Sequence, residues 1–224
     1  MTEANSLRIL LADDQDLVRL GFRLILESEA DLSVVGEAAN GREAIDRARE
    51  TSPDIILMDV RMPVLDGIEA TKQIVAGDSG ARIIMLTTFD LDQYALSALR
   101  AGASGFLLKD SKPRDLLETI RAVASGDATM ATRVTRSMLN LYAHQPSESS
   151  RESTANNPTS ALTPREREVL LAIGEGLSNG EIGEKFFLTE STVKTHVGRV
   201  LSKLQLRDRV HAVIFAYENN LIER

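Results

Sequence analysis

The stretch DIILMDVRMPVLDG, residues 54–67, indicates the fold class and raises a question about the role of Asp59. Residues 55–58 form an apolar run of about the length of a strand buried on both faces, and Pro63 with Asp66-Gly67 then predicts a loop. A carboxylate at this junction would lie at the carboxyl edge of a sheet, where open α/β folds carry their chemistry. The stretch alone leaves a second interpretation open, in which Asp59 only caps the following turn.

Short apolar runs alternate with segments of helical spacing in the amino-terminal half of the chain. The apolar runs are residues 7–12, 32–35, 55–58, 83–86 and 106–108. Between them, apolar residues recur at the spacing of one helix face, as in Leu17, Leu20, Leu24 and Ile25. Five strands that alternate with five helices predict an α/β fold, a doubly wound parallel sheet with helices on both faces.

The pattern changes in the last third of the chain. Residues 143–160 are rich in Ser, Thr, Asn and Pro and have almost no large apolar residues, which is typical of a flexible linker. We therefore expect a first domain over residues 1–130 and a connecting helix (131–142) with the linker over 131–160. Residues 161–224 contain helical signals only, so we expect an all-α domain of four helices there.

Composition and charge restrict the chemistry. The 224-residue chain has no cysteine and three histidines, so disulfides and thiolate metal sites are excluded and a metal would be held by oxygen. No apolar run approaches the roughly 20 residues that span a bilayer, and the start MTEANS lacks signal-peptide features, so we expect a cytoplasmic protein that does not bind membranes. The net charge is -7, yet residues 191–209 carry five basic side chains against Asp208 alone, which indicates a place for phosphates.

Polar side chains end four of the predicted strands. They are Asp13 and Asp14, Asp59, Thr87 with Thr88, and Lys109. Parallel strands end at one edge of a sheet, so we expect these groups to converge. Three clustered carboxylates repel each other unless a cation lies among them, and oxygen ligands suit Mg²⁺. Such a site would let Asp59 act as a nucleophile toward a phosphoryl group, with Lys109 pairing with a phosphoryl oxygen.

Residues 7–125 resemble a response-regulator receiver domain in the order and spacing of these motifs. The matching residues are Asp13-Asp14, Asp59 followed by Met62-Pro63 and Asp66-Gly67, Thr87, and the run AGASGFLLK that ends at Lys109. The resemblance implies a flavodoxin-like fold and phosphorylation of Asp59 by a partner histidine kinase. It also implies a Mg²⁺ cofactor.

The receiver resemblance also assigns roles to single residues. Asp14, Asp59 and the backbone carbonyl of Arg61 would bind Mg²⁺, and Asp13 would support the metal through water. Thr87 and Phe106 would form a switch pair, in which Thr87 moves inward on phosphorylation and the aromatic ring of Phe106 follows.

A helix-turn-helix is predicted in the second domain. In residues 190–205, helical spacing gathers Val193, Val197, Val200, Leu201 and Leu204 on a core face. The opposite face has Ser191, Thr195, Gly198 and Ser202, with Lys194 and Arg199 at its sides. Small polar residues flanked by cations are typical of a helix in a DNA major groove, and residues 181–187 with the turn at Leu188-Thr189 supply the preceding helix.

The segments LTPREREVL and GLSNGEIGEKFFLTESTVKTHVGRVLSKLQLRDRVHAV resemble the LuxR-type DNA-binding domain. Together with the receiver, they make the chain similar to NarL/FixJ-type response regulators. The expected DNA-binding residues are Ser191, Thr192, Lys194, Thr195, Gly198, Arg199 and Lys203. The resemblance assigns the last helix, residues 208–218, to a homodimer on paired half-sites through Val210, Val213, Ile214 and Tyr217. The alternative is that these four side chains complete the domain core.

These patterns predict a transcription regulator switched by phosphorylation. One alternative is a DNA-binding regulator whose receiver is controlled by protein contacts without phosphorylation. A second is a Mg²⁺-dependent phosphatase or phosphotransferase that works through an aspartyl phosphate. The haloacid-dehalogenase pattern is not found at Asp13 or Asp59, and Asp59 is followed two residues later by Arg61 instead of an acid. We therefore expect a protein that is not an enzyme.

Overall fold

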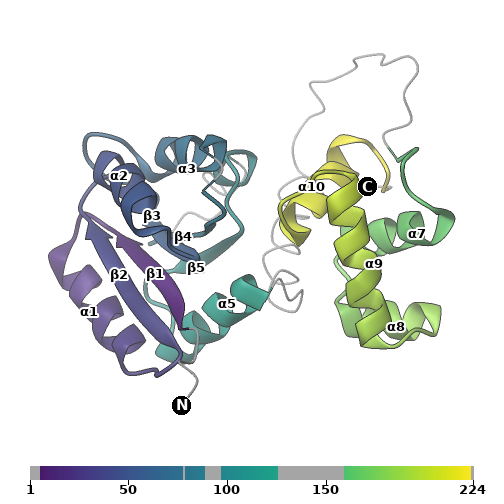
Figure 1. Cartoon of the computed structure of the whole chain (residues 1–224), viewed down its shortest axis with the longest axis horizontal. Helices are drawn as coiled ribbons and strands as arrows, with labels where there is room; N and C mark the ends of the chain where they lie inside the picture. Colours follow the sequence, from purple (N-terminus) through teal and green to yellow (C-terminus); the bar gives the residue numbers. More distant parts are fainter. Residues whose placement is uncertain (1–5, 78, 89–96, 126–158, 223–224) are drawn as a thin grey trace. The chain divides into compact units, whose positions relative to one another are not determined.

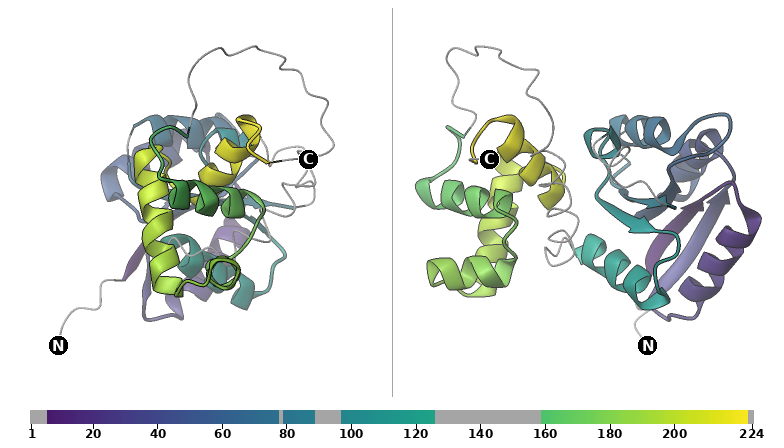
Figure 2. Two further views of the ribbon diagram at one scale, coloured as in Figure 1. Left: turned by 90° about the vertical axis from the view of Figure 1, so that its right-hand side faces the viewer. Right: turned by 180° about the vertical axis from the view of Figure 1, so that it is seen from behind.

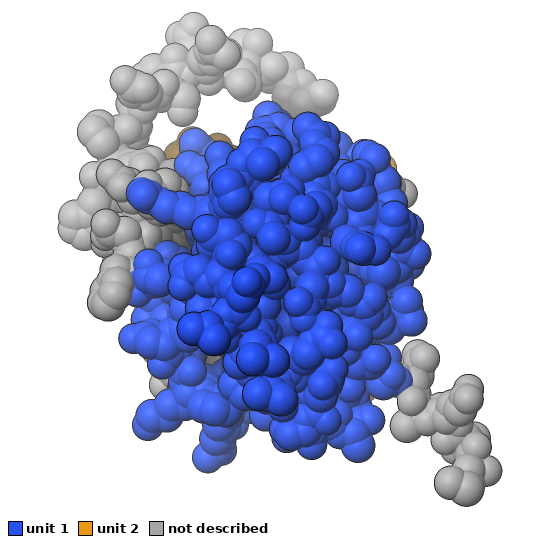
Figure 3. All heavy atoms as spheres, turned by 90° about the vertical axis from the view of Figure 1, so that its left-hand side faces the viewer, with its two compact units in different colours: residues 1–125 blue, residues 126–224 orange. Residues whose placement is uncertain are grey.

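The computed structural model describes residues 6–77, 79–88, 97–125 and 159–222. The chain divides into two compact units, residues 1–125 and 126–224, which Figure 3 colours separately. The predicted helix over 131–142 and most of the predicted linker lie outside the described residues. Within the described part of the chain, none of the helices has the length and apolar character needed to cross a membrane.

Unit 1 contains a five-stranded parallel sheet, as predicted (Figure 1). The strands are β1 (Leu7–Ala12), β2 (Leu32–Ala38), β3 (Ile55–Asp59), β4 (Arg82–Thr87) and β5 (Gly105–Leu108), in the order β2-β1-β3-β4-β5. β3 therefore lies at the centre of the sheet. β2 extends beyond the predicted run because it is an edge strand, whose half-buried end accommodates Gly36 and Glu37.

Helices cover both faces of this sheet (Figure 2). They are α1 (Asp16–Glu27), α2 (Gly41–Thr51), α3 (Gly67–Ala76) and α5 (Pro113–Ser125). α1 and α5 lie on one face and α2 and α3 on the other (Figure 1). The fifth helix was expected between β4 and β5, where residues 97–100 are helical and residues 89–96 lie outside the described part of the chain.

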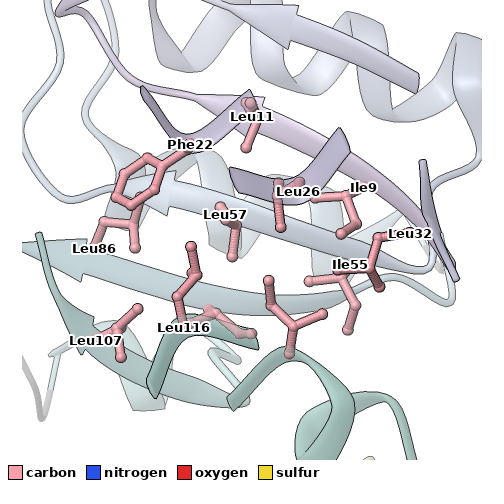
Figure 4. Close-up of a cluster of buried hydrophobic side chains, with 12 residues drawn as sticks. Ile9, Leu11, Phe22, Leu26, Leu32, Ile55, Leu57, Leu86, Leu107 and Leu116 are labelled. Carbon is pink, nitrogen blue, oxygen red and sulfur yellow. The ribbon is translucent and has the colours of Figure 1, made fainter. Parts of the chain in front are cut away.

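A core cluster fills the space between the sheet and the α1/α5 layer (Figure 4). It combines alternate residues of the strands with Phe22 and Leu26 of α1 and Leu116 and Ile120 of α5. Because β3 is buried along its whole length, the strand has no polar residue before Asp59, which is its last member. The hydrophobic core thus fixes the position at which the chain presents this carboxylate.

Unit 2 contains four helices in the described region, as predicted. They are α7 (Pro164–Gly174), α8 (Asn179–Phe186), α9 (Glu190–Lys203) and α10 (Arg209–Glu218). Capping boxes start α7 at Thr163 and α8 at Ser178. Val193, Val197 and Val200 of α9 pack into a shared core with α7, α8 and α10.

Candidate functional site

The predicted polar groups converge at the carboxyl edge of the sheet. Asp59 ends β3, Asp13 directly follows β1, and Lys109 directly follows β5. Backbone hydrogen bonds hold these strand ends, since the Asp13 N–H donates to the Ala38 carbonyl (3.1 Å) and the Lys109 N–H donates to the Thr87 carbonyl (2.8 Å). The side chains are thus positioned by the sheet itself.

Three carboxylates and one amine form an acidic pocket at this edge, made by Asp13, Asp14, Asp59 and Lys109. One carboxylate oxygen from each aspartate lies within 4.8 Å of the others. Lys109 Nζ lies 2.7 Å from Asp13 Oδ2 and 2.9 Å from Asp59 Oδ2. Asp13 and Asp59 are buried, whereas Asp14 is exposed.

The electrostatics of the acidic pocket suit a hard cation. Burial raises the pKa of Asp59, and this effect outweighs Lys109, whose hydrogen bond and charge act in the opposite direction. Burial also lowers the pKa of Lys109, but its hydrogen bonds to Asp13 and Asp59 outweigh burial and raise it overall. An added cation would favour the ionised Asp59, and three carboxylate oxygens fit the preference of Mg²⁺ for oxygen ligands.

Asp59 accepts a backbone hydrogen bond in the turn that follows it, but it also lies beside Lys109 and the other two aspartates, so capping that turn is not its only contact. Asp66 caps α3, because its Oδ1 accepts a hydrogen bond from the Glu69 N–H at 2.8 Å. A hydrogen bond from the Arg61 backbone reaches the Asp59 carboxylate and lowers its pKa, against the effect of burial. The loop after β3 therefore folds back on Asp59.

Gly67 is a positioning residue that the sequence indicated only as part of a turn. Its N–H donates to the Val60 carbonyl at 3.0 Å. A Cβ atom at this position would lie 1.9 Å from the carbonyl oxygen of Asp59. Only glycine therefore allows α3 to start against the backbone of Asp59.

The expected switch residues occupy neighbouring strands. Thr87 ends β4 and is buried, and Phe106 lies in β5 and is buried. In the register of the two strands Thr87 pairs with Leu108 and Phe106 pairs with Met85, so the two are not direct cross-strand partners. Their role as a switch pair stays a prediction.

The exposed face of α9 carries six of the seven expected DNA-binding residues. Those six are Ser191, Thr192, Lys194, Thr195, Gly198 and Arg199, all of them exposed. Thr189 caps the helix by accepting a hydrogen bond from the Thr192 N–H at 3.3 Å. Lys194 Nζ lies 3.2 Å from Glu190 Oε1 on the same helix. A polar helix face with side-chain hydroxyls and cations is thus available for a ligand.

Lys203, the seventh, has a partner inside the domain. Its Nζ lies 2.6 Å from Glu166 Oε2, and Glu166 also closes the capping box of α7. This ion pair joins the end of α9 to the start of α7. The sequence placed Lys203 among the basic residues expected to contact DNA. Its partner Glu166 lies 37 residues earlier and is brought near only by the tertiary fold, so this ion pair could not be predicted.

The residues expected at a dimer contact are mostly buried. Val210, Val213 and Ile214 are buried, and Val213 belongs to the core shared by the four helices. Tyr217 packs against that core as a partly buried residue. For Val213 and Tyr217 the alternative role in the domain core is therefore confirmed, and the dimer contact stays a prediction.

Two family models match the chain at the places where these sites lie. The response regulator receiver domain matches residues 9–121, and the luxR family of bacterial regulatory proteins matches residues 160–216. The first match includes all four residues of the acidic pocket. The second includes the whole of α7, α8 and α9.

Individual proteins resemble the chain over almost its full length. The transcriptional regulatory protein LiaR of Bacillus subtilis is 43% identical over 216 residues, which cover 96% of this chain and 99% of LiaR. The response regulator protein VraR of Staphylococcus aureus is 38% identical over 218 residues, 97% of this chain and 100% of VraR.

Solved structures agree with these relatives. The crystal structure of ChrA, a response regulator in a heme-sensing two-component system, is 34% identical and covers 97% of this chain and 100% of its own, with a TM-score of 0.51. A LuxR-family response regulator from Aurantimonas is 38% identical with a TM-score of 0.54, over 60% of this chain and 99% of its own. The chain belongs to the NarL/LuxR family of two-component response regulators, with a flavodoxin-like receiver domain and a LuxR-type helix-turn-helix domain that binds DNA in transcription regulation.

Proposed function

We propose that a partner histidine kinase phosphorylates Asp59 in a Mg²⁺-dependent reaction, and that this modification switches sequence-specific DNA binding. The observation that carries the proposal is the acidic pocket, in which Asp59 is buried within reach of two carboxylates and the Lys109 amine. A DNA target implies that the protein acts in the cytoplasm. An enzyme that forms an aspartyl phosphate would have to turn over an external substrate. The relatives are transcription regulators, which favours a switch over an enzyme.

The residues of the pocket have separate tasks in this reaction. Asp14, Asp59 and the Arg61 carbonyl would hold Mg²⁺, with Asp13 acting through water. When bound, Mg²⁺ neutralises charge on the incoming phosphoryl group. An Asp59 carboxylate oxygen attacks phosphorus, and the bond between phosphorus and the kinase histidine nitrogen breaks, leaving its electron pair on the imidazole. Lys109, already 2.9 Å from Asp59, then pairs with a phosphoryl oxygen.

The exposed apolar stripe of α1 is the surface we assign to the kinase. Leu17, Leu20 and Leu24 recur at helical spacing and are 83%, 51% and 62% exposed. α1 begins two residues after Asp14, so the stripe starts beside the acidic pocket. A donor that delivers a phosphoryl group to Asp59 has to dock at this edge, and an apolar helix face suits a helical partner.

The output of the switch is binding of operator DNA. The exposed face of α9 would enter the major groove, with Lys194 and Arg199 near phosphates and Ser191 and Thr195 toward the base edges. Inward movement of Thr87 followed by Phe106 would transmit phosphorylation to the receiver surface. A homodimer on paired half-sites would then form on phosphorylation or DNA binding.

Intact mass and DNA affinity, measured on one sample, test this function. The chain is treated with Mg²⁺ and acetyl phosphate, and an operator selected from random-sequence DNA is used in a band-shift assay. We expect a gain of one phosphoryl mass and tighter DNA binding, both absent from Asp59→Asn.

Asp66→Asn is the matched control, because asparagine caps a helix as well as aspartate does and Asp66 lies outside the acidic pocket. It should gain the phosphoryl mass like the wild type. DNA affinity that is unchanged by phosphorylation and equal in Asp59→Asn would overturn the switch and favour control by protein contacts.

A further inference from the structure

The Arg19 guanidinium contacts the backbone of Asp13, a residue of the acidic pocket, and has partners in three segments. Nη1 donates a hydrogen bond to the backbone carbonyl of Asp13 at 2.5 Å. Nη2 lies 2.5 Å from Asp16 Oδ1, and Nε lies 3.3 Å from Glu37 Oε2 on β2. A planar guanidinium serves several acceptors in fixed directions, which an ammonium group does less well. Arg19 therefore ties the loop between β1 and α1 to the neighbouring strand.

This contact fixes the peptide unit that leads into Asp14. The Asp13 N–H donates to Ala38 at 3.1 Å, so Arg19 on the carbonyl side completes the hold on the Asp13 backbone. Peptide units are planar, so a fixed Asp13 carbonyl also fixes the direction in which the chain enters Asp14. Asp14 is exposed, so the backbone direction set at Asp13 decides where the Asp14 carboxylate lies.

The charge of Arg19 is compensated by its own partners. Burial lowers the pKa of Arg19, but its hydrogen bonds to Asp16 and Glu37 outweigh burial and raise it, so the group stays charged. Removing this cation would leave two carboxylates less compensated near the acidic pocket and make the region more negative. A purely electrostatic role therefore predicts tighter cation binding after removal of Arg19, and a positional role predicts weaker binding.

We propose that Arg19 is a positioning residue of the acidic pocket: it holds the Asp13 carbonyl, and the affinity of the pocket for Mg²⁺ depends on this hold. The inference rests on the proposed Mg²⁺-dependent phosphorylation of Asp59 and adds a residue outside the set that would touch the metal or the phosphoryl group. Groups that orient metal ligands from behind commonly change metal affinity by about 10- to 100-fold.

Arg23 provides a matched control on the same helix. Its Nη2 lies 2.5 Å from Glu37 Oε1, and its Nη1 lies 3.7 Å from Glu27 Oε1. Arg23→Gln therefore removes the same charge beside the same Glu37, yet leaves the contact between Arg19 and Asp13 in place. A difference between the two glutamine variants isolates the bond to the Asp13 carbonyl.

The test is the Mg²⁺ dissociation constant of the full chain, measured by calorimetry without a phosphodonor. We expect Arg19→Gln to weaken Mg²⁺ binding about tenfold and Arg23→Gln to change it less than twofold. With acetyl phosphate, Arg19→Gln should be phosphorylated slowly at limiting Mg²⁺ and close to the wild-type rate at saturating Mg²⁺. A variant that had lost its structure would not regain the wild-type phosphorylation rate at saturating Mg²⁺.

Arg19→Lys keeps the charge and guards against a glutamine variant that fails to fold. It should bind Mg²⁺ with intermediate affinity, because an ammonium cannot serve the three acceptors together. Wild-type affinity in the lysine variant, or equal or tighter binding in Arg19→Gln, would overturn the positional role. If the wild type itself binds no Mg²⁺ and gains no phosphoryl mass, the proposed function fails instead.

Discussion

Gly198 lowers the stability of α9 relative to alanine, and this suggests that glycine is kept at position 198 for DNA binding. It lies inside α9, where glycine is about 1 kcal/mol less favourable than alanine, and no atom lies within 4 Å of the place a Cβ would occupy. Packing within the domain thus gives no reason for glycine. We expect Gly198→Ala to raise the free energy of unfolding by about 1 kcal/mol and to weaken operator binding, because the added methyl group hinders close approach to the duplex.

Gly21→Ala is the matched control for this prediction, since Gly21 lies inside α1 and also has open space around it. It should raise stability by a similar amount without any effect on the band shift. Operator affinity that is unchanged in Gly198→Ala would mean that position 198 does not approach DNA.

Phe187 and Val64 both have a positive φ angle, which their side chains disfavour. Phe187, with φ 55° and 96% exposure, follows α8, and Val64, with φ 68° and 83% exposure, follows β3. Asparagine tolerates this conformation, so Phe187→Asn and Val64→Asn should each stabilise their unit by about 1 kcal/mol. Denaturant titration checks both values. A loss of stability in either variant would mean that its side chain makes stabilising contacts that outweigh the backbone strain.

At the scale of elements, one ion pair joins the end of α9 to the start of α7. The hydrogen bond from Lys203, followed by the Thr163 backbone, lowers the pKa of Glu166 from 4.5 to about 2. A lowered pKa in the folded state stabilises the fold above the unfolded pKa, and this stabilisation is lost as the pH falls through the folded pKa. Glu166→Gln keeps a capping acceptor and loses the charge, so it should lower stability by about 1 to 2 kcal/mol at pH 7.

The pH dependence separates this ion pair from simple packing. The difference in unfolding free energy between wild type and Glu166→Gln should shrink as the pH falls from about 5 toward 2, because the wild-type carboxylate becomes protonated there. Chemical denaturation at several pH values measures it. A difference that stays constant over this range would assign the loss to packing of the side chain.

Removal of the α1 stripe should weaken docking of the kinase and leave the chemistry of the acidic pocket unchanged. Leu17→Ser combined with Leu20→Ser removes two exposed side chains, so stability should change by less than about 1 kcal/mol. Phosphorylation by acetyl phosphate should stay at the wild-type rate. Transfer from the partner kinase should slow by about tenfold or more. Loss of even half the free energy of burying one leucine side chain in the complex corresponds to a change of this size. Equal loss with both donors would contradict a docking role.

For the whole molecule, the features that were best predicted from the sequence are those set by the parallel sheet, namely its central strand and the edge at which the strands end. β3 is buried on both faces, so it stands out in the sequence as a continuous apolar run. Parallel strands end at one edge of the sheet, which correctly predicted that Asp13, Asp59 and Lys109 lie close together. Contacts of long side chains were not predictable in this way. Arg19 was not among the predicted site residues and Lys203 was expected to bind DNA, because their partners Glu37 and Glu166 are remote in sequence and are brought near only by packing.

The two units have separate cores, which predicts how the molecule unfolds. The cluster between the sheet and α1/α5 and the cluster of α7–α10 share no residue, so each unit should show its own thermal transition. Mg²⁺ should raise only the receiver transition, and operator DNA only that of the second unit, because a ligand stabilises the unit that binds it. Differential scanning calorimetry resolves the two transitions.

Phosphorylation should break this independence if the switch works as proposed. Coupling between two sites is reciprocal, so a phosphoryl group that tightens DNA binding requires that operator DNA also favour the phosphorylated receiver. With acetyl phosphate and Mg²⁺ present, operator DNA should therefore shift the receiver transition in the wild type and leave it unshifted in Asp59→Asn. A receiver transition that ignores DNA in both proteins, although Asp59 gains its phosphoryl group, would mean that the modification does not reach the DNA-binding domain.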